Sequence, residues 1–430
     1  MTDAELREAA ENQLRSNLRR GVSALNGKPY SFCVPSNVTY PFQWFWDSCM
    51  HAIVWSHIDV EQAKEELLTL LRAQRRNGRI PHRIAWEPPR RAPVLAMPVY
   101  PYRFYLHSTS VRNPVASRLV QPPLLAQAIE AVYRRSGDSE FLEQTTPAAE
   151  RFYRWLADNR DPDGDDLVSI IHPYESGLDH KPSFDPVFGF RRPSAIGATS
   201  AVRVLDVWNR TLGYNLSRIF SADRFNVEEL LFNCVYAQGL AALSRLWKEL
   251  GDPARAQEFQ ARSRRVEKAI LTKTRGLDGL YYDLYSRAEK MSPAKTVTGL
   301  FPLILDTIAK GEARRLVRSH LMNEEEFWLP YPLPTVAAND PSFNPEFESP
   351  SKSGLWRGPT WVATNWFLVQ GLRKHGYVDE AKHITARTRD LIERHGFREF
   401  YNPYSGEAYG APGFGWSTLI IDMLITTDAS

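Results

Sequence analysis

The sequence predicts an all-α protein built from successive helical hairpins. Most of the chain carries apolar residues at helical spacing. Short turns that contain glycine recur at 136–139, 250–253, 310–313 and 375–378, roughly sixty residues apart, or twice that where a long loop intervenes. The sequence has no long β-alternating run and no Pro/Ser-rich linker. About six helix pairs therefore form one domain, 1–430, for which a closed toroid fits as well as or better than an open solenoid.

The predicted helices of the first half begin and end at recognisable signals. Thr2 and Glu5 form a capping-box pattern, and the helix that they start ends at Gly21. Asp59 is a helix N-cap, and paired prolines at 122–123 open a later helix. After the first helix, the segment 40–58 starts irregular and becomes helical, and further helices are predicted at 59–72, 122–137 and 138–156.

Two segments between these helices are predicted to be loops. Residues 74–113 have little helical periodicity but carry Trp86 and several tyrosines, which predicts a long ordered loop of functional value. Residues 161–171, DPDGDDLVSII, read as a turn followed by a short extended run. DPDGDD resembles a calcium-binding loop superficially, but its glycine is misplaced and no terminal Glu follows. No metal site is predicted there or elsewhere.

From Asn226 onward the helical signal dominates the sequence. Apolar periodicity and Gly- or Pro-containing turns set the expected ends of each segment. The predicted helices are Val227–Leu250, Pro253–Thr272, Pro293–Ile308, Glu312–Met322, Trp361–Lys374, Val378–Arg394 and Trp416–Thr426.

The net charge and the aromatic content indicate which kinds of molecule the protein binds. The 53 basic and 50 acidic residues leave a net charge of +3, which does not favour a nucleic acid or an acidic membrane. The chain has 12 Trp, 18 Tyr and 21 Phe. Aromatic rings offer flat surfaces for the CH faces of sugars, so a nearly neutral chain with this composition leans towards carbohydrate.

The cysteines and the N-terminal residues favour a cytoplasmic protein. Cys33, Cys49 and Cys234 have no metal-ligand spacing and cannot pair evenly, which fits a reducing compartment. The first residues lack the apolar core of a signal peptide, and no run of about eighteen apolar residues occurs.

The segment HPYESGLDHKPSFD, residues 172–185, is the first candidate site. It places acids and a histidine in an irregular stretch that is punctuated by Pro and Gly, as expected where something polar is held. A solvated loop whose acids cap neighbouring helices fits these residues equally well.

Three further irregular segments carry aromatic residues and acids, at 40–47, 356–361 and 399–410. If the hairpins close into a ring, such segments converge on one pocket. Glycoside hydrolysis needs two carboxyl groups across a sugar, one protonated and one ionised. The candidate carboxylates are Asp47, Glu175, Asp179, Asp185, Glu399 and Glu407.

Structural roles compete with catalytic ones for these residues. Asp47 heads a helix and is a candidate cap, while Glu175 and Asp179 can hold their own loop by accepting backbone amides. Single tryptophans are more often core than sugar platforms. Arg357 suits a carboxylate clamp, but an internal ion pair is equally common. Signatures of serine hydrolases, P-loop and dinucleotide enzymes and zinc proteases are absent from the sequence.

Taken together, the motifs resemble family 63 of the glycoside hydrolases, above all its compact bacterial members, the mannosylglycerate and glucosylglycerate hydrolases. The motifs, in chain order, are WFWDS, QRRNGRIPH, QPPL, HPYESGLDHKPSFD, FNVEELLFNCVYAQGL, WRGPTW, EFYNPYSGE and GFGWS. They run from residue 44 to residue 417 and so cover nearly the whole chain. The resemblance implies an (α/α)6 barrel and an inverting exo-α-glycosidase that needs no cofactor.

The resemblance also implies roles for individual residues. The general acid is the Asp of the ESGxD motif, Asp179, and the general base is the first Glu of EFYNP, Glu399. The implied substrate-binding residues are Tyr40, Trp44, Trp46, Asp47, Gln121, Tyr174, Glu175, Gly177, Asp185, Trp356, Arg357 and Trp361. Aromatic burial and nearby Glu175 or Asp185 are expected to raise the pKa of Asp179.

Departures from the family pattern lie beside the proposed acid. Tyr174 stands where a Trp is expected, and His180 and Lys181 stand where Asn-Ser often follows the acid. They affect the expected aglycone end more than the sugar end. The GFGWS motif is closer to the mannosylglycerate form than to the glucosylglycerate form.

The expected substrate is accordingly a small α-glycoside, with mannosylglycerate preferred over glucosylglycerate. Arg75, Arg76, Arg79 and Arg357 are candidates to attract the glycerate carboxylate. Two alternatives remain: an α-glucosidase for small gluco-oligosaccharides, and a non-catalytic toroid that binds sugars or a protein. The sequence leaves open a homo-oligomer and closure of the 74–113 loop over substrate.

Overall fold

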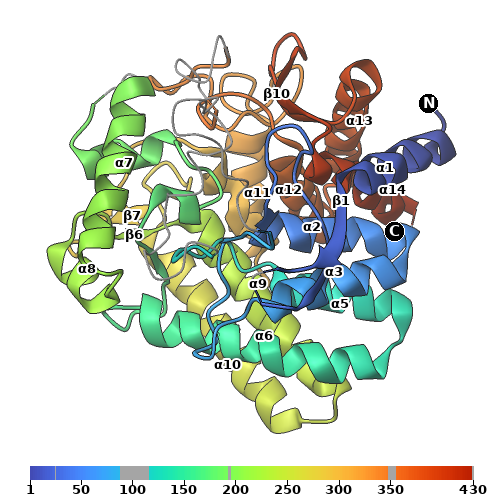
Figure 1. Cartoon of the computed structure of the whole chain (residues 1–430). Helices are drawn as coiled ribbons and strands as arrows, with labels where there is room; N and C mark the ends of the chain where they lie inside the picture. The colour runs from blue at the N-terminus through green and yellow to red at the C-terminus, as the bar shows by residue number, and fades with distance from the viewer. Residues whose placement is uncertain (25, 88–115, 192–194, 347–354, 429–430) are drawn as a thin grey trace, which may run out of the picture.

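The computed structural model describes residues 1–430 except 25, 88–115, 192–194, 347–354 and 429–430. The chain is mostly helical, as predicted, with a few short strands in the loops (Figure 1). Within these residues no helix is both long and apolar enough to cross a membrane. Most of the predicted 74–113 loop lies outside the described residues, and only its first part can be placed.

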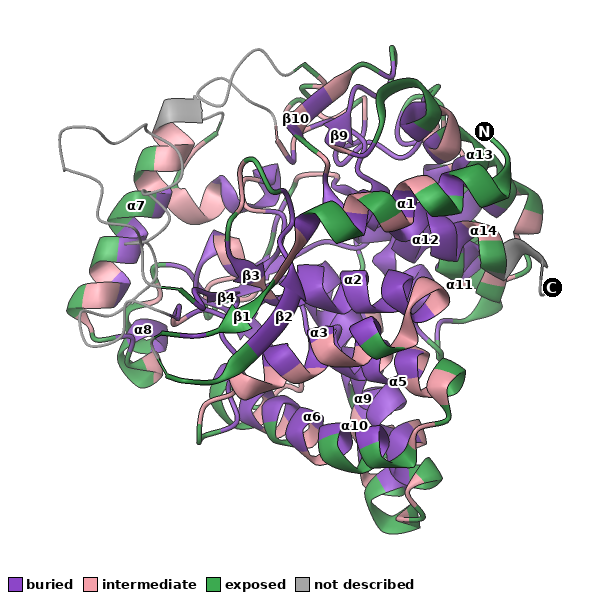
Figure 2. Ribbon diagram, turned by 45° about the vertical axis from the view of Figure 1, so that its right-hand side comes forward, coloured by how far each residue is buried: buried purple, intermediate pink, exposed green. Residues whose placement is uncertain are grey.

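An inner ring of helical segments closes on itself. Its members are α2 (Phe45–Ile58), α5 (Leu125–Ser136), α9 (Leu230–Glu249), η4 (Val297–Ile304), α12 (Val362–Lys374) and η6 (Gly415–Leu419), which continues into α14 (Ile420–Asp428). Each member packs against the next, and η6 packs against α2. Helix α2 is buried from Phe45 to Ser56, as expected for an inner helix with protein on every side (Figure 2).

An outer helix covers each inner member. The outer helices are α3 (Val60–Arg72), α6 (Ser139–Arg160), α10 (Pro253–Lys273), α11 (Lys310–Arg315) with η5 (Leu316–Leu321), α13 (Val378–His395) and α1 (Asp3–Asn17). These helices expose one face to solvent (Figure 2). The six pairs formed by the described residues make the predicted (α/α)6 toroid.

Several predicted helix ends are confirmed. The capping box of Thr2 and Glu5 is present at α1, and Asp59 caps α3 by accepting the Gln62 amide at 3.1 Å. Gly137, with φ +63°, ends α5 in the left-handed conformation. Helix α1 ends at Asn17 rather than Gly21, because the next residues form a strand.

Two predictions of helix type or extent are wrong. The predicted helix Pro293–Ile308 is the shorter 3₁₀ segment η4, in which Pro302 supplies no amide hydrogen. Helices α7 (Ala195–Thr211) and α8 (Leu216–Ala222) lie in a region where the sequence predicts no helix. Gly197 and several β-branched residues lower the intrinsic helix propensity of α7.

Short antiparallel strands brace the loops. Their bounds are β1 (Leu18–Val22) with β2 (Pro29–Cys33), β3 (Gln43–Trp44) with β4 (Arg83–Ile84), and β9 (Arg398–Tyr401) with β10 (Ala408–Pro412). A four-stranded sheet joins β5 (Ser169–Ile170), β6 (Val227–Glu228), β7 (Leu284–Tyr285) and β8 (Lys290–Met291). The predicted extended run at 161–171 is therefore confirmed in its last part, as β5.

Candidate active site

The loop that carries Asp179 is anchored by a buried ion pair. It leaves β5 and passes through the 3₁₀ turns η1 (Pro173–Glu175), η2 (Pro182–Phe184) and η3 (Pro186–Phe188). The fully buried Glu175 carboxylate binds Arg160 through two hydrogen bonds of 2.8 and 2.5 Å. It also accepts the amides of Val120 at 3.0 Å and Ile171 at 2.8 Å. Glu175 therefore holds the loop in place, the structural role considered for it, and its oxygens are engaged by protein.

Gly177 allows this loop to cross the face of an indole ring. Its φ of +75° lies in the left-handed region, and a Cβ there would stand 2.6 Å from the ring of Trp46. Any other residue would combine backbone strain with a clash. The predicted residues Gly177 and Trp46 are thus packed together. Gly177 stands two positions before Asp179 in the sequence, so this contact lies close to the proposed acid.

Asp179 is isolated from hydrogen-bond donors. Its side chain is partly exposed, and apart from its own amide no donor to its carboxylate occurs among the described residues. Burial raises the pKa of Asp179 to about 7, assisted by the negative charges of Glu399 and Asp47. The raised pKa agrees with the sequence-based expectation. The charges that raise this pKa are those of Glu399 and Asp47, not those of Glu175 and Asp185 as expected. Glu175 and Asp185 are each paired with an arginine.

Glu399 projects from β9 and is held by two donors. Its Oε1 accepts the Tyr40 hydroxyl at 2.9 Å, and its Oε2 accepts the Ala411 amide at 2.7 Å. Burial raises the pKa of Glu399, while these two hydrogen bonds lower it. Gly410 permits the close approach, because a Cβ there would lie 2.5 Å from Oε2.

Asp47 is the third carboxyl of the group. It lies in the first turn of α2 and is 3% exposed. Burial raises the pKa of Asp47 to about 7, and His51 one helical turn later opposes this rise, whereas Glu399 adds to it. The N-cap of α2 is Trp44, so Asp47 is not the N-cap residue, although its carboxylate accepts its own backbone amide in the first turn.

Tryptophan and phenylalanine rings form a continuous wall beside these carboxyls. Trp356 and Trp361 stack with centroids 3.6 Å apart, and Trp361 also stacks on Phe400, next to Glu399. Trp416 contacts Trp361 at 5.6 Å and Trp46 at 5.5 Å. Trp416 was not among the predicted site residues, although it lies in the GFGWS motif that supported the resemblance.

Three of the predicted aromatic residues are more exposed than the rings of the wall. Tyr40 and Trp44 are partly exposed and contact each other edge to face at 6.3 Å. Tyr174 is partly exposed and lies beside His180, with ring centroids 6.5 Å apart. The predicted residue Gln121 is buried and its side chain accepts the amide of Trp46 at 3.2 Å, so it holds the start of α2.

Two of the four predicted cationic residues, Arg357 and Arg79, are committed to protein partners, whereas Arg76 is exposed and Arg75 partly exposed. Arg357 binds Asp185 through two hydrogen bonds of 2.9 and 2.5 Å, the internal ion pair considered for it. Arg79 is buried and donates to the carbonyls of Ser117 at 3.0 Å and Leu119 at 3.4 Å. Burial lowers the pKa of His180 to about 4, helped by the charge of Arg357, so this imidazole is neutral at pH 7.

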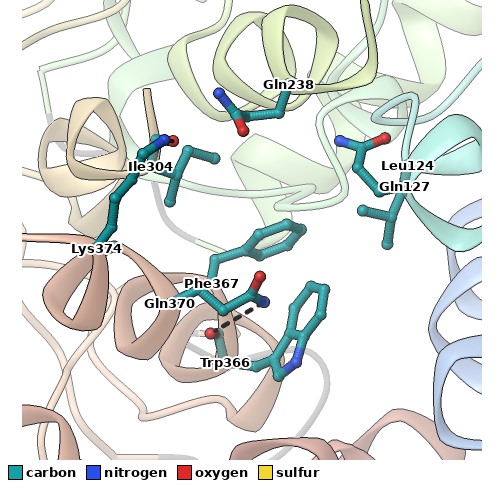
Figure 3. A pocket seen from close by; sticks show the side chains of 9 residues that line it. Leu124, Gln127, Gln238, Ile304, Trp366, Phe367, Gln370 and Lys374 are labelled. Atoms are coloured by element: carbon teal, nitrogen blue, oxygen red, sulfur yellow. Dashed lines mark hydrogen bonds between the residues drawn. The ribbon is translucent and has the colours of Figure 1, made fainter. Parts of the chain in front are cut away.

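A separate cavity of about 200 Å³ lies between α5, α9, η4 and α12 (Figure 3). Its lining includes Gln127, Gln238, Gln370 and Lys374. The last two belong to the final turns of α12, whereas Trp361 precedes its first turn. No predicted catalytic or substrate-binding residue lines this cavity.

Known glycoside hydrolases are similar to this protein over most of its chain. The model of the mannosylglycerate hydrolase MGH1-like glycoside hydrolase domain matches residues 40–417. A mannosylglycerate hydrolase of Thermus thermophilus is 30% identical over 91% of this chain and 95% of its own length. A glucosylglycerate hydrolase of Mycolicibacterium hassiacum is 24% identical over 89% of this chain and 91% of its own length. The crystal structure of a family 63 mannosylglycerate hydrolase from Thermus thermophilus, with Tris and D-glycerate, matches with a TM-score of 0.81 and 29% identity, covering 98% of this chain and all of that one.

Proposed function

Because this chain belongs to the family of MGH1-like glycoside hydrolases, we propose that it hydrolyses the α-glycosidic bond of a glycosyl-glycerate, with 2-O-α-mannosylglycerate as the preferred substrate. The observation that carries the proposal is the unequal treatment of two carboxyls. Asp179 has a pKa raised to about 7 and accepts no hydrogen bond from a described side chain, whereas Glu399 accepts two hydrogen bonds. This asymmetry suits one protonated and one ionised group.

In this proposal Asp179 is the general acid. Its proton goes to the oxygen that bridges the sugar and the glycerate as the bond from that oxygen to the anomeric carbon breaks. The glycerate then leaves with a hydroxyl group, and charge does not build up on it. Burial keeps Asp179 protonated for this step near neutral pH.

Glu399 is the general base on the opposite face of the sugar. It takes one proton from a water molecule, and the oxygen of that water bonds to the anomeric carbon. The two hydrogen bonds from Tyr40 and Ala411 favour the ionised form that this step requires. The product is the free sugar with inverted anomeric configuration. Glu399 then releases its proton to solvent, and Asp179 takes one up from solvent.

The aromatic wall and Asp47 are the proposed sugar subsite. Trp44 and Tyr40 present partly exposed rings for the CH face of the sugar, and Asp47 is a candidate acceptor for its hydroxyl groups. The stacked Trp356 and Trp361 support this subsite from behind, because both are almost fully buried. Their contribution to sugar binding is the shape of the wall.

Arg357 is the proposed contact for the glycerate carboxylate. Its hydrogen bonds to Asp185 use one hydrogen each on Nη1 and Nη2, and a guanidinium group has five. The remaining donors are available to a second carboxylate. The neutral His180 lies near Arg357 and is a candidate partner for a glycerate hydroxyl group. Glu175 and Arg79 are left out of this subsite, because protein groups occupy them.

A proton NMR time course on α-mannosylglycerate tests the proposal, since it reports hydrolysis and anomeric outcome together. We expect β-mannose as the first sugar product and slower hydrolysis of α-glucosylglycerate. A short series of α-gluco-oligosaccharides runs in parallel. Faster hydrolysis of an oligosaccharide would replace the proposed substrate, and first release of α-mannose would contradict inversion.

A further inference from the structure

Four carboxylates meet on the side of the toroid that bears the four-stranded sheet. Asp163 and Asp165 come from the loop after α6, Glu228 from β6, and Glu289 from the turn between β7 and β8. One oxygen of each residue lies within 4.8 Å of the corresponding oxygens of the other three. None of these residues belongs to the candidate active site.

Glu228 is the member that needs explanation. Its side chain is only 6% exposed, and its buried Oε2 has no hydrogen-bond partner among the described residues. A buried carboxylate oxygen without a partner carries a large desolvation cost. This Glu228 oxygen therefore lacks a cationic or hydrogen-bonding partner in the part of the chain that the structure describes.

Lys273 supplies only part of the missing charge. Its ammonium group bonds to Asp165 and lies 2.8 Å from Glu289, so one positive charge faces four negative ones when all are ionised. No bond from Lys273 to Glu228 or Asp163 occurs among the described residues. Lys273 lies at the end of α10 with its side chain 27% exposed, so it can turn towards solvent when another cation enters.

We infer that these four residues form a binding site for one calcium ion. The donor set consists of carboxylate oxygens, which hard divalent cations prefer, without nitrogen or sulfur ligands. Calcium takes oxygens at about 2.3–2.6 Å, so ligands on opposite sides lie up to about 5 Å apart. All four oxygens lie within 4.8 Å of one another, which fits this span. Magnesium usually keeps several of its waters and is held by one or two carboxylates, so a set of four protein carboxylates favours calcium.

The inferred site gives the DPDGDD segment a function that its sequence alone did not support. Asp161 accepts the amides of Gly164 at 2.7 Å and Asp166 at 3.1 Å and so shapes the loop. The carboxylate that seemed to be missing from the segment comes from Glu228, on a strand that pairs with β5. A calcium ion there would tie together the loop, β6 and the β7–β8 turn beside the strand that leads to Asp179. Its expected effect is stability, and the inference does not depend on the proposed reaction.

The test is thermal unfolding of the full chain after treatment with EDTA and dialysis into metal-free buffer. Calcium chloride at a hundredfold excess over its dissociation constant is expected to raise the melting temperature by about 3 °C. Magnesium chloride at the same concentration is expected to give a smaller rise. Isothermal titration calorimetry with calcium chloride should show one site per chain. An absence of binding heat, or equal shifts with both metals, would overturn the assignment to calcium.

Variants assign the effect to these residues. Glu228→Gln is expected to abolish the calcium-dependent rise, and Asp163→Asn, which changes an exposed side chain, should reduce it even if the first variant does not fold. Asp166→Asn is the matched control from the same loop, since Asp166 pairs with Arg265 and is not one of the four. It should keep the full rise. A calcium response that persists unchanged in Asp163→Asn and in any folded Glu228→Gln protein would overturn the site.

Discussion

The two halves of the candidate active site hold their carboxyls in opposite ways. The 172–185 loop presents Asp179 without a side-chain donor and fixes it through packing and through the buried Glu175–Arg160 pair. The β9–β10 hairpin presents Glu399 between the Tyr40 hydroxyl and the Ala411 amide. Burial raises the pKa of both carboxyls, so burial alone does not distinguish them. The difference in hydrogen bonding favours the protonated form of Asp179 and the ionised form of Glu399.

The largest expected effect comes from removing either carboxyl. Asp179→Asn and Glu399→Gln should each lower kcat/KM for mannosylglycerate by about 10³-fold. The comparison predicts that they differ on a 2,4-dinitrophenyl α-mannoside, whose leaving group needs no proton. Asp179→Asn should recover most of its activity on that substrate, and Glu399→Gln should not. The opposite pattern would exchange the two roles.

A smaller loss is expected from disturbing the packing that positions the acid. Gly177→Ala places a methyl group against Trp46 at a φ of +75°. A displacement of about 1 Å at the neighbouring Asp179 lowers the rate by up to about 10²-fold. Gly189→Ala is the matched control, because Gly189 has φ +73° but open space around its Cβ position. If both variants lose the same activity, packing against Trp46 does not position the acid.

Removing one donor from Glu399 should have a more modest effect. Tyr40→Phe deletes the hydroxyl hydrogen bond that lowers the pKa of Glu399. The base is active when ionised, so the acidic limb of the kcat/KM profile should move to higher pH, with a loss of about tenfold at its centre. Tyr282→Phe, which removes a hydroxyl bonded to Asp278, should leave the profile in place. An unchanged acidic limb in Tyr40→Phe would contradict the proposed origin of the asymmetry.

The smallest predicted effect is a shift of the alkaline limb in Asp47→Asn. Asp179 acts when protonated, so activity should fall as pH rises through its pKa of about 7. Asp47 contributes a negative charge that raises this pKa. Its removal should lower the pKa of Asp179 and move the alkaline limb to lower pH, whatever happens to the maximum rate. A shift to higher pH would show that Asp179 does not control that limb.

Local signals predicted much of the fold. Periodicity and the caps at Thr2, Asp59 and Gly137 placed most helices of the ring. Helix α7 was not predicted, because its glycine and β-branched residues lower the intrinsic helix propensity of the segment. Tertiary packing makes it helical, and a single sequence gives no direct access to that packing.

The sequence indicated candidate residues for the site but not the ion pairs that these residues form. The irregular segments placed Asp179 and Glu399 among six candidate carboxylates, and the resemblance selected these two as the acid and the base. The Glu175–Arg160 and Asp185–Arg357 pairs join residues 15 and 172 positions apart, and charge type alone cannot select such partners. The same limit hid Glu228, whose neighbours in the acidic cluster lie more than sixty residues away in sequence. The catalytic roles themselves stay predictions until the variants are measured.

The pairing of α1 with η6 has a consequence for biosynthesis. This pair joins the first helix of the chain to one of the last, and the Gln13 and Asn17 side chains both bond to the carbonyl of Gly413. A ribosome makes α1 before η6, so α1 lacks its inner partner until residues beyond 413 have emerged. The hairpins between them can form in order during translation, but the ring closes only afterwards. Glu399 lies on that late segment, so a nascent chain that already displays Asp179 remains without its proposed base until the β9–β10 hairpin has been made.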